Sequence, residues 1–134
     1  MDPLEIVGSA ALALATGDLE RHLSFVAQEV IWQVNEQPPR SGREGYRSIR
    51  AALELGGESI VGSEVAGVIA EGDSEVDVRV VAERHLPTPP PKPRRDDSFP
   101  STAMYDTVYT VRSGRITRIT LAAFSGPNRV SRYP

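Results

Sequence analysis

The first quarter of the chain carries apolar residues at helical spacing. Asp2 and Pro3 predict a helix start, because aspartate caps free backbone N–H groups and proline at the first helical position loses no hydrogen bond. Gly17 predicts the end of this helix, and Asp18 the start of a second. The residues expected to face the core are Leu4, Ile6, Val7, Ala10, Ala11 and Leu14, followed by Leu19, Leu23 and Val26.

Residues 29–35 change to a period of two, which is typical of a strand with one buried face, here made by Val30, Trp32 and Val34. Pro38-Pro39 stops this strand. A third helix is expected over residues 42–55, with an inward face of Tyr46, Ile49, Ala52 and Leu53.

Four more strands are expected at residues 61–70, 75–86, 104–112 and 115–124. A turn-forming segment at 71–74 joins the first pair, and Ser113-Gly114 joins the second as a tight hairpin. This order predicts an α+β fold in which three helices cover one face of a curled antiparallel sheet.

Residues 1–134 are expected to form one domain with a short C-terminal tail at 125–134. Between the two hairpins, residues 87–101 contain six prolines among charged residues. We interpret this segment as an elongated hairpin loop that could cover the mouth of a pocket. The alternative is a ligand for a proline-recognising module.

Composition narrows the classes of function. The net charge of −3 gives no general attraction to nucleic acid or to an anionic membrane, so neither partner is expected. The chain has no cysteine and two histidines, which disfavours thiolate chemistry and a histidine-rich metal site. We expect no cofactor, and we expect a cytoplasmic protein because no secretory signal or membrane span is evident.

Four short motifs resemble the nuclear transport factor 2-like superfamily in their order and spacing: residues 15–19, 30–32, 41–43 and 111–116. The resemblance covers about residues 4–124. It implies a cone-shaped, curved antiparallel or mixed sheet wrapped by three N-terminal helices.

Within this superfamily, the stretch from Trp32 through Pro38-Pro39 to Gly42-Arg43 looks most like limonene-1,2-epoxide hydrolases. Glu83-Arg84 and Leu86-Pro87-Thr88 also resemble that family, although they cannot both be matched without a gap. Steroid delta-isomerases and SnoaL-like polyketide cyclases share the frame more loosely.

The resemblance implies a water held by a tyrosine, an asparagine and a basic aspartate, with an acidic aspartate steered by an arginine. The tyrosine position falls on Trp32, the asparagine on Val34 and the basic aspartate on Leu121. The arginine and the acid fall on Arg84 and Leu86, or on Arg79 and Val81 in the other register. Four of the five positions therefore lack the implied chemistry, so the epoxide hydrolase mechanism is not expected.

Arg84 and Asp106 are the candidate catalytic residues. Arg84 shares the apolar phase of its strand, so it should either pair with a buried acid such as Asp106 or anchor an oxyanion of a ligand. Asp106 falls on the protonated aspartic acid of the steroid isomerases, and it could point inward or outward. His85 is expected on the solvated face.

The expected ligand is a hydrophobic small molecule, in a pocket lined by Trp32, Val34, Tyr46, Leu86, Val108 and Leu121. One hypothesis is an isomerase, cyclase or hydrolase that uses Arg84 and Asp106. A second is a binding protein for an apolar or aromatic acid. A third, compatible with both, is a homodimer formed through the outer sheet face, with Val65, Val81 and Tyr109 in the interface. A monomer at micromolar concentration in sedimentation would contradict the homodimer.

Overall fold

The computed structural model describes residues 1–55, 59–85 and 102–124. The expected loop at 87–101, the whole of Leu86-Pro87-Thr88 and the expected tail at 125–134 lie outside these residues. In chain order the elements are α1 (Pro3–Ala15), α2 (Leu19–Leu23), β1 (Val26–Val34), β2 (Arg40–Ser41), α3 (Arg43–Leu55), β3 (Ser59–Glu71), β4 (Glu75–His85), β5 (Thr102–Arg112) and β6 (Arg115–Phe124).

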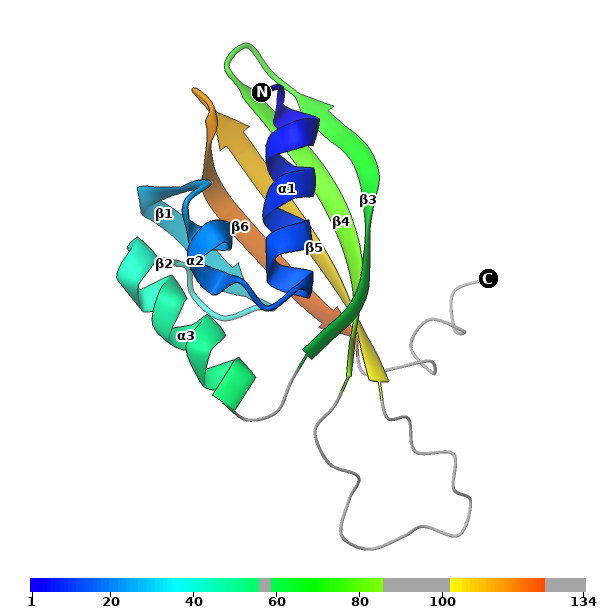
Figure 1. Cartoon of the computed structure of the whole chain (residues 1–134). Coiled ribbons are helices and arrows are strands. Elements are labelled where there is room, and N and C mark those ends of the chain that lie inside the picture. Colours follow the sequence, from blue (N-terminus) through cyan, green and yellow to red (C-terminus); the bar gives the residue numbers. More distant parts are fainter. Residues whose placement is uncertain (56–58, 86–101, 125–134) are drawn as a thin grey trace, which may run out of the picture.

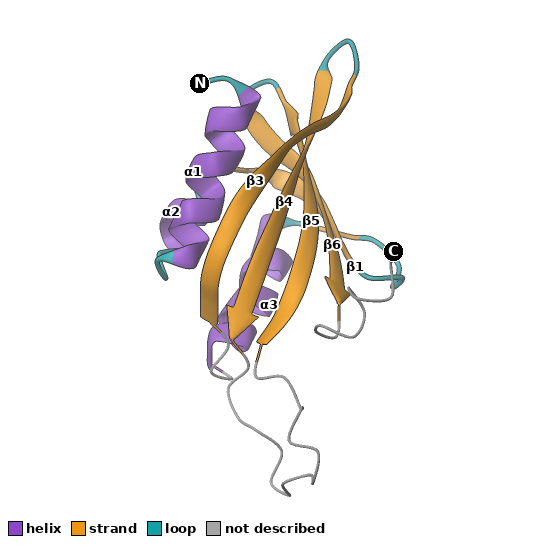
Figure 2. Cartoon of the chain, turned by 90° about the vertical axis from the view of Figure 1, so that its right-hand side faces the viewer, coloured by secondary structure: helices purple, strands orange, loops and turns teal. Residues whose placement is uncertain are grey.

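The six strands form one open sheet in the order β2-β1-β6-β5-β4-β3. Neighbouring strands are antiparallel except β1 and β6, which are parallel. The sheet curves, and the helices lie on its concave side, α1 across β3 to β5 and α3 beside β1 (Figures 1 and 2). The predicted α+β class with three helices on a curved, mixed sheet is confirmed.

Local signals explain the first helix. The Asp2 carboxylate accepts a hydrogen bond from the Glu5 backbone N–H at 2.9 Å, and the Glu5 carboxylate accepts one from the Asp2 N–H at 3.0 Å. This reciprocal capping box, followed by Pro3, fixes the start of α1 as predicted. Leu4 is an exception to the expected core face, because 44% of it is exposed.

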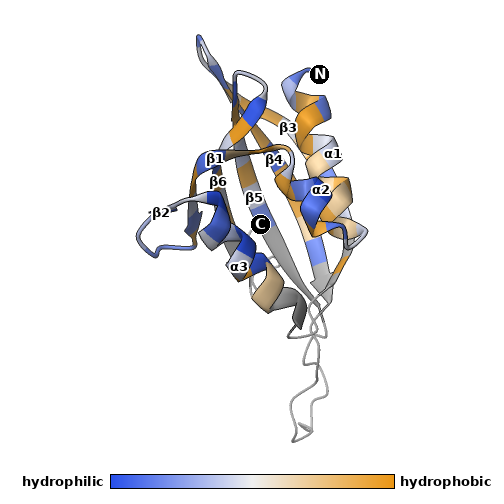
Figure 3. Ribbon diagram, turned by 60° about the vertical axis from the view of Figure 1, so that its left-hand side comes forward, coloured by the Kyte–Doolittle hydropathy of each residue, from blue (hydrophilic) through white to orange (hydrophobic). Residues whose placement is uncertain are grey.

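The core lies between α1 and the concave sheet face. Its fully buried side chains include Val7 from α1, Val26 and Val30 from β1, Val78 from β4 and Ile116 from β6. Figure 3 shows the contrast between α1, which is largely hydrophobic, and α3, which carries mostly hydrophilic residues. In α3 the structure exposes Ala52, which was expected to face inward.

Gly42 connects β2 to α3 and fixes where α3 begins. Its N–H donates to the Val30 carbonyl at 2.8 Å, and its own carbonyl accepts from the Tyr46 N–H at 3.2 Å and from Trp32 Nε1 at 3.3 Å. Its φ is +108°, a backbone conformation that L side chains rarely adopt. One glycine therefore holds the Trp32 side chain and the backbone of Tyr46, two residues that line the cavity described below.

We expect Gly42→Ala to destabilise the fold by about 1–3 kcal/mol. An added Cβ would meet no atom within 4 Å, so the cost is that of the backbone conformation alone. Gly8→Ala is the matched control: Gly8 lies within α1, its added Cβ would lie 3.9 Å from Val65 Cγ2, and the change should stabilise by about 0.5–1 kcal/mol. Urea unfolding of both variants measures the two effects, and the same sign for both would contradict this account.

Candidate functional site

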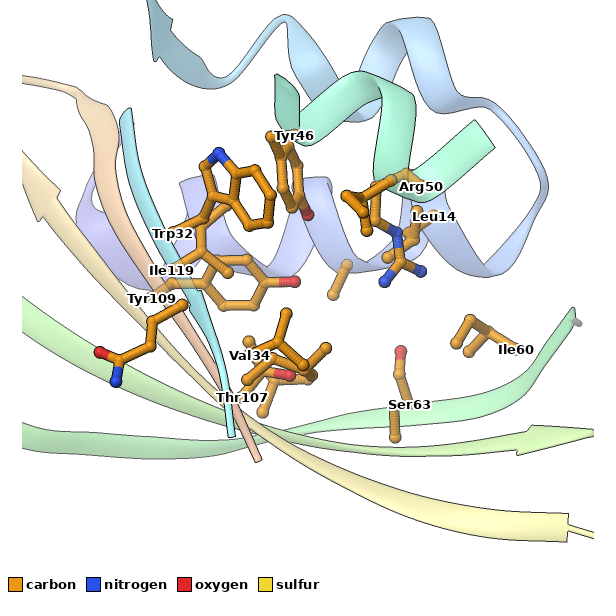
Figure 4. A pocket seen from close by; sticks show the side chains of 16 residues that line it. Leu14, Trp32, Val34, Tyr46, Arg50, Ile60, Ser63, Thr107, Tyr109 and Ile119 are labelled. Carbon is orange, nitrogen blue, oxygen red and sulfur yellow. The ribbon is translucent and has the colours of Figure 1, made fainter. Parts of the chain in front are cut away.

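A cavity opens between α1, α3 and the concave face of the sheet (Figure 4). The space between its lining atoms, including its open mouth, is about 610 Å³. The lining is mainly apolar, and all its residues come from helices or strands: Ala11, Leu14, Trp32, Gln33, Val34, Tyr46, Ile49, Arg50, Ile60, Ser63, Val80, Ala82, Thr107, Tyr109, Ile119 and Leu121.

Aromatic rings form one wall of the cavity. The rings of Trp32 and Tyr46 lie with their centroids 6.3 Å apart, and both side chains are buried. Tyr109 reaches the same cavity from β5, and the ring of His22 lies near both tyrosines, at 5.7 Å from Tyr46 and 6.4 Å from Tyr109. This wall offers flat apolar surfaces against which a hydrophobic molecule can pack.

His22 lies directly behind this wall and is fully buried. Its Nδ1 lies 2.8 Å from the Ala10 carbonyl, which can only accept, so Nδ1 carries the proton. Its Nε2 then accepts from the Tyr46 hydroxyl at 2.8 Å. Burial lowers the pKa of His22 to about 4, so the imidazole is neutral at physiological pH. His22 thereby ties α1 and α2 to α3 and fixes the direction in which Tyr46 donates.

The two tyrosines keep their protons. Burial raises the pKa of Tyr46 above its usual range and also raises the pKa of Tyr109, because a phenolate would lose its hydration. The Tyr46 proton is committed to His22. The Tyr109 hydroxyl has no partner in the described part of the chain, so it can donate to a molecule in the cavity.

Arg50 brings a positive charge into this lining. It is buried, with 6% exposure, and its Nε has no hydrogen-bond partner among the residues that the structure describes. Its charge acts to lower the pKa values of His22, Tyr46 and Tyr109, although burial has the larger effect on each. Figure 4 shows the guanidinium of Arg50 and the hydroxyls of Tyr46 and Tyr109 turned toward the interior of the same cavity.

Four of the six residues predicted to line a pocket belong to this lining: Trp32, Val34, Tyr46 and Leu121. Leu86 lies outside the described residues. Val108 is a correction: the cavity face of β5 carries Thr107 and Tyr109, so the side chain of Val108, between them, points to the opposite face of the sheet.

Asp106 also lies on the face of the sheet opposite to the cavity. Its two carboxylate oxygens accept hydrogen bonds from Nε and Nη2 of Arg79, both at 2.8 Å. Asp106 therefore forms a bidentate ion pair with Arg79 on the face away from the cavity, whereas a pair with Arg84 was one of the two alternatives expected from the sequence.

The backbone of Arg84 lies in β4, opposite Ala103 of β5 and Ile60 of β3. Val80 and Ala82, which precede it on the same strand phase, both line the cavity, as the apolar phase of β4 predicted. The position of the Arg84 side chain lies outside the described part of the structure, so its role stays a prediction.

Two residues of the candidate site were missed in the sequence, although their spacing carried the signal. His22 follows Leu19 by three residues and precedes Val26 by four, which puts it on the buried stripe of the second helix. Arg50 follows Tyr46 by four residues, so it shares the inward face of the third helix with Tyr46. Both were passed over because charged and titratable residues on helices are usually solvated.

No group of three metal-ligating side chains occurs in the part of the chain that the structure describes. In that same part, no helix is long and apolar enough to span a membrane.

The open curved sheet with helices on its concave face defines a nuclear transport factor 2-like domain. The sequence profile of the SnoaL-like domain matches residues 8–119, so the chain belongs to this family. The superfamily expected from the sequence motifs is thereby confirmed. No curated protein sequence matches the chain.

Solved structures share this fold at low sequence identity. A candidate polyketide cyclase from Xanthomonas campestris pv. campestris is 20% identical, with a TM-score of 0.63 over 89% of this chain and 87% of that one. A ketosteroid isomerase-like protein from Erwinia carotovora atroseptica is 11% identical, with a TM-score of 0.68 over 91% and 93%. An epoxide hydrolase of M. tuberculosis described as LEH-like is 12% identical, with a TM-score of 0.61 over 90% and 80%.

Proposed function

We propose that the chain binds a hydrophobic small molecule in the cavity between α1, α3 and the sheet. The observation that supports this most is the described lining itself, in which apolar and aromatic side chains from seven different elements surround a few hydroxyl groups and one cation. Burial of apolar ligand surface against such walls contributes about 25 cal/mol for each Å² removed from water. Sites of this composition are the usual binding sites for small molecules.

Binding is favoured over acid–base catalysis because the described lining contains no carboxylate and no histidine. Asp106 is engaged with Arg79 on the other face, and both ring nitrogens of His22 are occupied. A general base must lie within hydrogen-bond reach of the proton that it removes. Cyclisation, isomerisation and epoxide hydrolysis, named for the similar structures, are therefore not part of this proposal.

Trp32 provides a direct test, because it is the only tryptophan in the chain and it lines the cavity. We expect the neutral probes cyclohexanecarboxamide and octanamide to change the emission of Trp32 saturably, because either would displace water from beside the indole. A rise in melting temperature with probe concentration should accompany the change.

Two variants of adjacent residues in β4 serve as test and control. Ala82 lines the cavity, and Val81, on the opposite strand phase, does not. Ala82→Phe should fill the cavity and weaken probe binding at least tenfold, whereas Val81→Phe should leave it unchanged. No saturable response in the native protein, or an equal response in both variants, would contradict the proposed function.

A further inference from the structure

Among the described residues, Arg50 is a buried cation whose Nε has no hydrogen-bond partner. Arg50 is 6% exposed, its Nε lacks an acceptor, and no acceptor for any of its nitrogens occurs in the described residues. Arg43 also has a buried Nε without a partner, but its Nη1 donates to the Val26 carbonyl at 3.1 Å. Arg47, one turn before Arg50 on α3, forms ion pairs with Glu20 and Glu44 outside the cavity. Arg50 alone among these three arginines lines the cavity without an acceptor.

Nothing around Arg50 in the described structure neutralises its charge. Its titratable neighbours are His22, Tyr46 and Tyr109, and burial keeps all three neutral. The rest of the described lining is uncharged. An unpaired charge in apolar surroundings is costly, and an anion in the cavity would offset that cost.

The charge and the donors around Arg50 define the class of anion. A single positive charge balances a monoanion, whereas a phosphate monoester would bring nearly two negative charges into apolar walls. The guanidinium offers a planar pair of donors that matches a carboxylate. Tyr109 and Ser63 add neutral hydroxyl donors to the lining, while the Tyr46 proton is directed to His22.

We propose that Arg50 is the anion subsite of the cavity and that the ligand is an apolar monocarboxylic acid whose carboxylate pairs with Arg50 and Tyr109. This inference rests on the proposed function, because it requires the cavity to bind a hydrophobic molecule. Trp32 and the aliphatic side chains of the lining would contact the hydrocarbon part of the acid, while the carboxylate lies at the α3 side of the cavity.

Pairs of acids and amides of equal shape test this inference. Cyclohexanecarboxylate with cyclohexanecarboxamide, and octanoate with octanamide, differ by one negative charge within each pair. At pH 7.5 we expect the native protein to bind each acid about 10–100 times more tightly than its amide, since a charge-assisted hydrogen bond has about that effect. Titration calorimetry and the emission of Trp32 measure the four affinities.

Arg50→Met should reduce the ratio of acid to amide affinity to about one while amide binding persists. Arg47→Gln is the matched control, because it removes one positive charge from the same helix outside the cavity, and it should leave the ratio unchanged. Tyr109→Phe should lower the ratio partially, since it removes a neutral donor and keeps the ring.

Melting temperatures separate the ligand subsite from a structural role of Arg50. Glu54 follows Arg50 by four residues on α3, the spacing at which helical ion pairs form, and its side chain lies outside the described residues, so the Glu54→Gln variant tests for a structural pair. If Arg50 binds a ligand, Arg50→Met removes an unpaired charge, so the melting temperature of the free protein should be unchanged or higher. Glu54→Gln should then leave the ratio of acid to amide affinity unchanged. Equal losses of stability in Arg50→Met and Glu54→Gln would overturn the inference.

The remaining outcomes distinguish the two proposals. Tight binding of both members of a pair, with no preference in the native protein, would overturn the anion subsite and leave the hydrophobic cavity as a binding site. Binding of none of the four probes at millimolar concentration would contradict both.

Discussion

Replacing His22 with alanine is expected to lower the free energy of unfolding by about 3–5 kcal/mol, a large part of the stability of a domain of this size. The side chain is fully buried, so its loss leaves a cavity between the helices and the sheet. The change also leaves the buried Tyr46 hydroxyl without its acceptor, and it removes the hydrogen bond that His22 Nδ1 donates to the Ala10 carbonyl of α1. Urea unfolding with an unchanged m-value measures the effect.

Two further variants help to interpret this loss: one removes only the hydrogen bond to Tyr46, and the other is a control on the exposed side of α2. Tyr46→Phe keeps the ring but leaves Nε2 of His22 without a donor, and it should cost about 1–2 kcal/mol. Arg21→Ala, beside His22 on the exposed side of α2, should cost less than about 1 kcal/mol. A loss below about 1 kcal/mol in His22→Ala would contradict the central position that we assign to this residue.

Elements of the fold were predicted correctly where the sequence contains strong turn or capping signals. The predicted strand at 115–124 matches β6 in full, because Ser113-Gly114 fixes the turn before it. Both residues of this turn have positive φ, 53° and 79°, as a tight hairpin requires. The two-residue strand β2 was missed because Arg40–Ser41 is too short to show a period and is paired only through tertiary structure.

The candidate site was harder to predict because β5 carries apolar residues on both phases. From Tyr105 to Tyr109 either phase could form the buried face, so the sequence left the direction of Asp106 open. The structure resolves it through the pairing of Asp106 with Arg79, on the face that the cavity does not use. Alternation in β4 was unambiguous, and Val80 and Ala82 lie where it predicted.

The contribution of Arg50 could be read only with the tertiary structure. Its spacing on α3 places it on the face of Tyr46, but a helical arginine is commonly solvated and can extend its charge to water. Burial of Arg50 in the cavity lining, with 6% exposure, restricts that route. The spacing therefore indicated only that Arg50 lies on the inward face of α3. The tertiary structure shows that this face borders the cavity between α1, α3 and the sheet, which makes Arg50 a candidate binding group.

Acidification is expected to destabilise the protein through His22 by about 3 kcal/mol between neutral pH and pH 4. Burial lowers the pKa of His22 from 6.5 to about 4 in the folded chain, whereas in the unfolded chain the group keeps its ordinary value. As the pH falls below about 6.5 the unfolded chain binds a proton that the folded chain excludes. The stability from neutral His22 is therefore complete above pH 6.5, decreases by about 1.4 kcal/mol per pH unit toward pH 4, and changes no further below it.

The groups that face His22 support this direction. Arg50 opposes the imidazolium, and Tyr46 and Tyr109 stay neutral across the whole range because burial raises the pKa of each. Only the Ala10 carbonyl favours the protonated ring, and its effect is smaller than that of burial.

Urea unfolding at intervals from pH 7.5 to 4 measures the slope of stability against pH. His22→Gln, whose amide can still accept from Tyr46, is the reference, because every other titratable group is common to the two proteins and its contribution cancels in the difference. A flat difference curve between pH 6.5 and 4 would show that His22 is solvated rather than held neutral between the helices.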